Sequence, residues 1–175
     1  IMATDGWWAA AGRADGNFTV LVDKAVAALR ARGILDSTKQ VRIMATDGWW
    51  AAAGRADGNF TVLVDKAVAA LRARGILDST KHATIMACGG WWAAGGRADG
   101  DFTKLVDEAV AALTKRGIDS TKHATIMASN GWWAAAGRAD GDFDLLVASA
   151  VSALENNGKV LLPSSHATIL ASNGW

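Results

Sequence analysis

The chain has 175 residues, of which 51% are hydrophobic and 20% are charged, a balance that is typical of a folded globular protein and excludes a disordered one. With 18 Lys and Arg against 17 Asp and Glu, the net charge is +1, so neither a nucleic acid nor an anionic membrane surface is indicated as a partner. No apolar stretch approaches the roughly 20 residues that cross a bilayer, and the single cysteine, Cys88, cannot form an internal disulfide.

Internal repeats organise the whole chain. Residues 1–39 recur without a change as residues 43–81, and two diverged copies follow. The predicted units of a single repeat array are therefore residues 1–42, 43–84, 85–125 and 126–168, with a partial fifth copy at 169–175. The sequence starts and stops at the same phase of the motif and begins with Ile, which predicts an array that is part of a longer chain.

The first half of each copy is predicted to be a β-hairpin. In the fourth copy Asn130-Gly131 precedes two tryptophans, the partial fifth copy also has Asn-Gly, and the first three copies have Asp-Gly or Gly-Gly there. These residues tolerate the positive φ that a type I′ turn requires. The hairpin would pair residues 126–129 with 132–135, so that large side chains face small ones. An alternative, based on the helix preference of alanine, makes the Trp-Trp-Ala-Ala segment a helix and each repeat a βαα unit.

The second half of each copy is predicted to be a helix that follows an Asp-Gly turn. In the third copy, apolar residues at positions 102, 105, 106, 109, 110 and 113 share one helical face. Asp101 is predicted to cap its start, and Gly117, followed by Ile118, to end it in a left-handed conformation. The Asp-Ser-Thr-Lys segments that follow are predicted to be polar loops.

These elements predict an α+β fold of tandem ββα repeats, each about 42 residues long. One such unit is too small to be stable alone, so neighbouring repeats must share a core. The sequence predicts a mainly antiparallel sheet with helices on one face, and ferredoxin-like connectivity between adjacent repeats.

Residues that could carry chemistry are sparse. His82, His123 and His166 occur once per repeat at the same phase, without the further ligands that a zinc site needs. Gln40 takes the same place in the first copy, which predicts that a hydrogen-bonding side chain suffices there. The carboxylates of residues 140, 142 and 144 lack the remaining ligands of a calcium loop. No catalytic residue, metal or cofactor is predicted, and the protein is not expected to be an enzyme.

Candidate binding residues come from the tryptophan doublets and from an arginine that follows each of them. On a strand the two tryptophans point to opposite faces, so one per repeat would be exposed unless a second layer covers it. The arginines would bind an acidic partner or form salt bridges in the turn. The candidates are Trp8, Trp50, Trp92 and Trp133, and Arg13, Arg55, Arg97 and Arg138.

The predicted function is that of a structural or scaffolding protein that mediates protein-protein assembly. Its identical repeats would present one surface again and again to a protein partner or to copies of the same chain. The alternative is a multivalent, lectin-like protein that binds carbohydrate through one tryptophan in each repeat, with weak sites reinforced by avidity.

Overall fold

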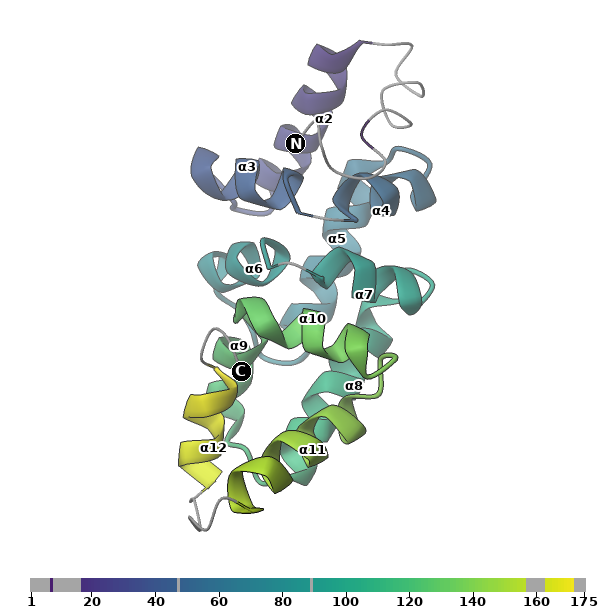
Figure 1. The fold of residues 1–175 in the computed structure, drawn as a ribbon. Helices are drawn as coiled ribbons and strands as arrows, with labels where there is room; N and C mark the ends of the chain where they lie inside the picture. Colours follow the sequence, from purple (N-terminus) through teal and green to yellow (C-terminus); the bar gives the residue numbers. More distant parts are fainter. Residues whose placement is uncertain (1–6, 8–16, 47, 89, 157–162, 172–175) are drawn as a thin grey trace.

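The computed structural model describes residues 7, 17–46, 48–88, 90–156 and 163–171. Within these residues every regular element is an α-helix, and no strand is present (Figure 1). The predicted α+β class, with its ββα units, antiparallel sheet and ferredoxin-like connectivity, is therefore wrong. The βαα alternative is right about the tryptophan segment and wrong about its strand.

Each repeat contributes three kinds of helix. The short helices that carry the tryptophans are α4 (Trp49–Arg55), α7 (Trp91–Arg97) and α10 (Asn130–Arg138). The long helices are α2 (Phe18–Ala31), α5 (Phe60–Ala73), α8 (Phe102–Lys115) and α11 (Phe143–Asn156). The third helices are α3 (Ser37–Met44), α6 (Ser79–Met86), α9 (Ser120–Met127) and α12 (Pro163–Leu170).

Helices of the same kind stack on one another from repeat to repeat. The long helices pack in the order α2, α5, α8, α11, and the short and third helices form parallel columns of their own. The result is an elongated stack with α2 and α3 toward one end and α11 and α12 toward the other (Figure 1). This is the architecture of an α-solenoid, in which a repeat buries its apolar faces against its neighbours.

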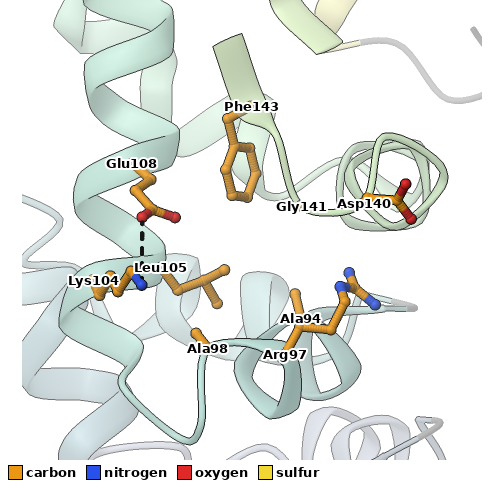
Figure 2. Close-up of a pocket in the computed structure, with 9 residues that line it drawn as sticks. All are labelled: Ala94, Arg97, Ala98, Lys104, Leu105, Glu108, Asp140, Gly141 and Phe143. Carbon is orange, nitrogen blue, oxygen red and sulfur yellow. Dashed lines mark ion pairs between the residues drawn. The ribbon is translucent and has the colours of Figure 1, made fainter. Parts of the chain in front are cut away.

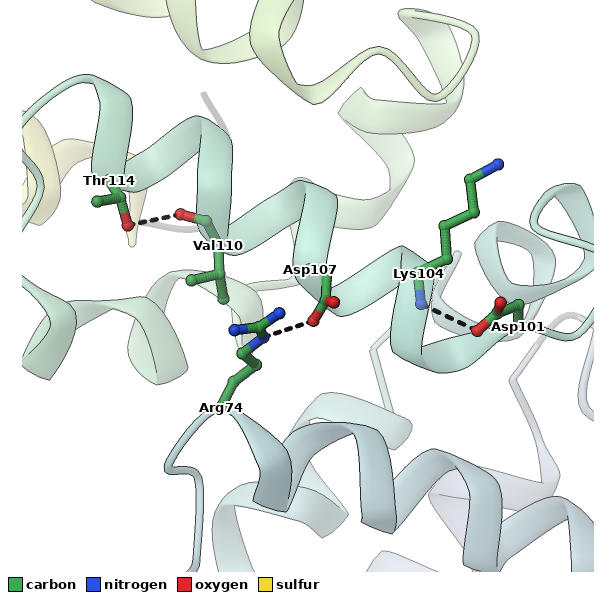
Figure 3. Close-up of polar contacts among 6 residues, drawn as sticks. All are labelled: Arg74, Asp101, Lys104, Asp107, Val110 and Thr114. Atoms are coloured by element: carbon green, nitrogen blue, oxygen red, sulfur yellow. Dashed lines mark hydrogen bonds and ion pairs between the residues drawn. The ribbon is translucent and has the colours of Figure 1, made fainter.

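The long helices form as predicted. The Asp101 side chain accepts a hydrogen bond from the Lys104 amide at 2.9 Å and so caps the first turn of α8 (Figure 3). Gly117, with φ +70°, ends the helix, and the Ile118 amide donates to the Leu113 carbonyl at 3.1 Å. Ile118 is only 3% exposed, so the hydrophobic contact expected after the stop is present.

In the second and third copies, the glycine before the tryptophan segment links two helices instead of two strands. Gly48 and Gly90 have φ +85° and +88° and stand at the N-caps of α4 and α7. The Gly48 carbonyl accepts the first helical hydrogen bond, from Ala52, at 2.8 Å. The left-handed glycine was therefore correctly predicted in the second and third copies, whereas Asn130 and Gly131 of the fourth copy lie inside α10, and the hairpin was wrong in all three.

The predicted first strand and the polar loop before it together form the third helix. The loop aspartates Asp36, Asp78 and Asp119 are N-caps, each accepting a hydrogen bond from the amide two residues later at 2.7 to 2.8 Å. Those bonds hold the pKa of Asp119 below its ordinary value. The segment that was predicted as strand 126–129 holds the last turn of α9 and the residues directly after it.

Ion pairs link the end of each long helix to the next long helix. Arg32 pairs with Asp65, Arg74 with Asp107 at 2.5 Å, and Lys115 with Asp144 at 2.5 Å (Figure 3 shows the second pair). Hydrogen bonds from the guanidinium groups lower the pKa values of Asp65 and Asp107 below the ordinary 3.8.

These lowered pKa values predict a loss of stability in acid. The carboxylates bind protons more readily in the unfolded chain, so the stabilisation is present above about pH 3.8 and is lost as the pH falls through the folded-state values. Urea denaturation between about pH 5 and pH 2 should show a steeper decrease in the free energy of unfolding for the native chain than for an Asp65→Asn/Asp107→Asn variant. The two proteins should differ little at pH 7, because both aspartates are partly exposed to solvent. Equal slopes in acid would contradict the assignment.

Candidate interaction surface

Both tryptophans of every described doublet are buried. The six indoles of Trp49, Trp50, Trp91, Trp92, Trp132 and Trp133 have an exposed fraction of 0%. Between repeats, edge-to-face contacts join Trp49 to Trp92 and Trp91 to Trp133, each with 4.7 Å between ring centroids. Within a doublet the centroids are 6.3 Å apart. The indoles of successive described repeats are therefore in continuous contact through the core.

The two members of a doublet differ in their hydrogen bonds. The second indole donates to the carbonyl of the methionine that ends the preceding third helix, as Trp92 does to Met86 at 2.8 Å. Trp50 and Trp133 make the equivalent bonds, to Met44 at 2.9 Å and to Met127 at 2.7 Å. The first indoles, those of Trp49, Trp91 and Trp132, have a buried nitrogen without a partner among the described residues.

The predicted exposed row of tryptophans is thus absent from the described repeats, where Trp50, Trp92 and Trp133 belong to the core. Trp8 lies outside the described residues. Stacking on a sugar requires an accessible ring face, so the burial of these indoles gives no support to the carbohydrate interpretation.

Gln40, His82 and His123 fulfil the predicted hydrogen-bonding role, whereas Nε2 of the buried His166 has no partner among the described residues. Gln40 donates to the Ile34 carbonyl at 2.7 Å, and Nε2 of His82 and of His123 lies 2.5 and 3.0 Å from the carbonyls of Ile76 and Ile118. A carbonyl can only accept, so Nε2 carries the proton. These side chains satisfy the carbonyl that follows each long helix, and they are buried in the third helices rather than at the polar strand end that the hairpin predicted.

Because Gln40 and His82 make equivalent hydrogen bonds, glutamine and alanine at residue 82 should differ in their effect on the free energy of unfolding. His82→Gln should change the free energy of unfolding by less than about 1 kcal/mol, whereas His82→Ala should cost about 1–3 kcal/mol because it leaves a buried carbonyl unsatisfied. Urea denaturation of the two variants would measure the difference. A glutamine variant as unstable as the alanine variant would show that the carbonyl bond is not what the site requires.

The candidate arginines have different positions. Arg97 and Arg138 are exposed at the ends of α7 and α10, and Arg55 ends α4. Arg13 and the side chain of Arg55 lie outside the described residues. Arg97 lines a surface hollow between the third and fourth repeats (Figure 2), so one of the candidate residues contributes to a concave surface.

The same hollow recurs at successive repeat junctions. Between the third and fourth repeats it has a volume of about 190 Å³ and lies among the end of α7, the first half of α8 and the Asp140-Gly141 turn (Figure 2). One repeat earlier an equivalent hollow of about 100 Å³ lies among α4, α5 and the Asp99-Gly100 turn. Corresponding residues line both, because the two junctions pack in the same way.

A second pair of hollows lies on the other side of Lys66 and Glu108. These hollows measure about 410 and 330 Å³, and Ala69 and Ala111 lie on their helix side. With the first pair they make a shallow depression on the outer side of the long helices, which we call the outer groove. It is lined by residues 62, 66 and 69 with the 99–103 turn, and by residues 104, 108 and 111 with the 140–144 turn.

The repeats differ from one another at several positions, some of which lie on the helix side of the outer groove. Val62 and Lys66 are replaced by Lys104 and Glu108 in the next repeat, and by Leu145 and Ser149 in the last, on an exposed helical face. The leucine and the valine between them are the same in all three, and the valine is buried in each. Sequence reasoning missed this surface, because only some of the positions that differ between copies belong to it.

The charges of the groove are mixed. Lys104 and Glu108 form a 4.0 Å ion pair on the helix side. Asp99 and Asp140, with φ +52° and +51°, are exposed on the turn side. Such an open surface of alternating charge and small residues can hold side chains of a partner, and it holds no cluster of activated groups.

The part of the chain that the structure describes gives little support for metal binding, for cysteine chemistry or for a membrane crossing. It contains no group of three or more His, Cys, Asp or Glu side chains placed to hold a metal ion. Cys88 is buried, and burial raises the pKa of its thiol to about 11. None of the described helices combines the length and the hydrophobicity that a membrane crossing demands.

Comparisons with protein-family models, with curated proteins and with solved structures found no match.

Proposed function

We propose that the protein is a non-enzymatic scaffold that binds protein partners along the outer groove. The observation that carries this proposal is the recurrence of the outer groove at successive repeat junctions with different residues on its helix side, Val62 and Lys66 at one junction and Lys104 and Glu108 at the next. Core positions such as Leu63 and Leu105 stay the same, since they hold the stack together. An exposed, concave face whose residues change from one repeat to the next is the arrangement expected of a recognition surface on a repeat protein.

A protein suits this groove better than a small molecule does. The hollows are open, and each offers only a few polar groups, whereas small-molecule sites are concave enough to bury most of their ligand. A polypeptide could place side chains in successive hollows and gain affinity from several weak contacts at once. The Lys66 site and the Glu108 site differ in charge sign, so successive hollows would select different side chains of the partner.

Bulky groups placed in the groove test this function. The Ala69→Arg/Ala111→Arg variant puts two long side chains into the larger hollows. Ala93→Arg/Ala134→Arg is the matched control, because these alanines are also exposed but lie on the short helices. Proteins cross-linked to the native chain in an extract of its source would be identified, and their affinities then measured with the purified variants.

We expect the groove variant to bind such a partner at least about tenfold more weakly than the native chain, a change of about 1.4 kcal/mol. The control should bind like the native chain. Equal affinity of both variants, or no partner cross-linked to the native chain, would count against the proposal.

A further inference from the structure

Two of the connections between a long helix and a third helix carry an exposed leucine. Leu35 and Leu77 stand at the same position of successive repeats and are 72% and 74% exposed, the highest values among the large hydrophobic side chains that the structure describes. Leu77 has described repeats on both sides, and neither of them covers it. A Cβ atom at Gly33 would lie 3.4 Å from the Cβ atom of Ser79, so the connection that carries Leu35 lies against the start of the next third helix.

The fold does not need this leucine. The third connection runs directly from Ile118 to Asp119 and lacks it, which makes the third repeat one residue shorter. The cap of the helix that follows is nevertheless the same, since Asp119 accepts from the Thr121 amide at 2.8 Å and Asp78 accepts from the Thr80 amide at 2.7 Å. The leucine therefore leaves its apolar surface free for a partner, and burial of that surface would favour binding.

The outer groove offers a recess for an apolar side chain once per repeat. Each of the two hollows that measure about 100 and 190 Å³ is lined by a buried leucine and a buried phenylalanine, by a lysine on its helix side and by an aspartate on its turn side. These are Leu63, Phe102, Lys66 and Asp99 in the smaller hollow, and Leu105, Phe143, Lys104 and Asp140, together with Arg97 and Glu108, in the larger one (Figure 2).

The leucine connections carry charges of both signs that complement this lining. An aspartate, Asp36 or Asp78, directly follows each leucine and could face the lysine of a hollow. An exposed arginine, Arg30 or Arg72, lies five residues before each leucine in the last turn of the long helix and has no ion pair among the described residues. These arginines could face the aspartates on the turn side, and such complementary pairs fix how two surfaces dock.

The leucine connections and the groove are on different sides of the stack. The connections lead into α3 and α6, which lie on the left of Figure 1, whereas the Asp-Gly turns that line the groove lie on the right. One molecule can therefore present its leucines to one neighbour and its groove to another.

We propose that a second copy of this chain binds in the outer groove by placing Leu35 and Leu77 in two successive hollows. Both the leucines and the hollows are one repeat apart in the same stack, so two contacts can form together and reinforce each other. The contact uses two different surfaces of the chain, so it joins molecules side by side into larger assemblies. The proposal rests on the proposed scaffold function, because it names the partner that occupies the outer groove.

The test uses one variant for each surface. The leucine variant, Leu35→Ser/Leu77→Ser, removes the apolar side chains and leaves the groove intact. The hollow variant, Val62→Glu/Lys104→Glu, places carboxylates at two equivalent, exposed positions on the helix side of the hollows, where they would repel the aspartate that follows each leucine. Val41→Ser is the matched control, since Val41 is 51% exposed on α3 but lies outside the leucine connections.

Circular dichroism establishes that each variant is folded, and light scattering after gel filtration gives its mass. For the native chain and for Val41→Ser we expect the mass to rise with concentration above the 18.2 kDa of one chain. The leucine variant and the hollow variant should each remain at the mass of one chain. Their mixture should reach the mass of two chains and no more, because each variant retains one intact surface.

A native chain that stays at 18.2 kDa at the highest concentration would overturn the self-association, as would a mixture of the two variants that does not associate. Assembly that Val41→Ser disrupts as much as the leucine variant does would also overturn it. If the leucine variant still binds a different protein cross-linked from the source extract, the scaffold function stands although the self-association fails. The two failures can therefore be told apart.

Discussion

Replacing Trp92 with alanine is expected to lower the free energy of unfolding by about 3–5 kcal/mol. The indole is 0% exposed, lies edge-to-face against Trp49 of the preceding repeat with 4.7 Å between centroids, and donates to the Met86 carbonyl at 2.8 Å. Its removal opens a cavity at a junction between repeats and leaves a buried carbonyl without a donor. Urea denaturation followed by far-ultraviolet circular dichroism measures the loss without depending on tryptophan emission.

Replacing each tryptophan of the doublet in turn with phenylalanine distinguishes the contribution of ring packing to stability from that of the hydrogen bond. Trp92→Phe loses the bond to Met86, whereas Trp91→Phe removes an indole nitrogen that is buried without a partner among the described residues. We expect Trp92→Phe to cost about 1–3 kcal/mol more than Trp91→Phe. If the two variants were equally unstable, the indole bond to the Met86 carbonyl would contribute nothing to the free energy of unfolding.

The long helix was predictable because its signals are local. The apolar face from Phe102 to Leu113, the Asp101 cap and the Gly117 stop each depend on residues within one or two turns, and the structure has all three. The repeat boundaries also follow from the sequence, because identical segments must fold alike.

The tryptophan segment was mispredicted because a glycine with positive φ suits two different structures. It can form the second position of a hairpin turn, and it can stand as a left-handed residue between two helices, as Gly90 does. The choice depends on what the doublet packs against. Two adjacent indoles are both buried here because helices from the neighbouring repeats cover them, and no pattern within one repeat reveals that cover.

The third helix was missed because its first residues are ambiguous. Aspartate, serine and threonine favour loops and helix N-caps for the same reason, their short polar side chains bonding to nearby amides. Asp78 bonds to the amide of Thr80 and begins a helix that places His82 under the Ile76 carbonyl. The predicted hydrogen-bonding role of that histidine was correct, because it rested on the exchange with Gln40 and not on the strand.

The outer groove could not be located from one repeat, since its two sides come from different repeats. Glu108 lies on a long helix and Asp140 in the turn before the next one, and only the stacking of α8 and α11 brings them to one hollow. The replacement of Val62 and Lys66 by Lys104 and Glu108 is visible in the sequence. Its meaning depends on knowing which helical face is exposed.

Replacing Gly90 with alanine is expected to cost about 2–5 kcal/mol, from about 1–2 kcal/mol of left-handed backbone strain and about 1–3 kcal/mol of overpacking. With φ +88°, a Cβ atom at Gly90 would lie 3.0 Å from the Ala134 nitrogen and 3.0 Å from the Trp133 carbonyl carbon. Both are backbone atoms of the next tryptophan helix, which cannot move away without separating the repeats. The free energy of unfolding from urea denaturation would report the loss.

Gly100→Ala is the matched control, because Gly100 has φ +78° and its Cβ would meet nothing within 4 Å. It should cost only the backbone strain of about 1–2 kcal/mol. A larger loss at Gly90 than at Gly100 would show that glycine is needed there for the close approach of adjacent repeats as well as for the turn. If the free energy of unfolding fell by the same amount in both variants, the turn alone would account for the glycine at residue 90. The contact with the Trp133 backbone would then not limit how closely adjacent repeats pack.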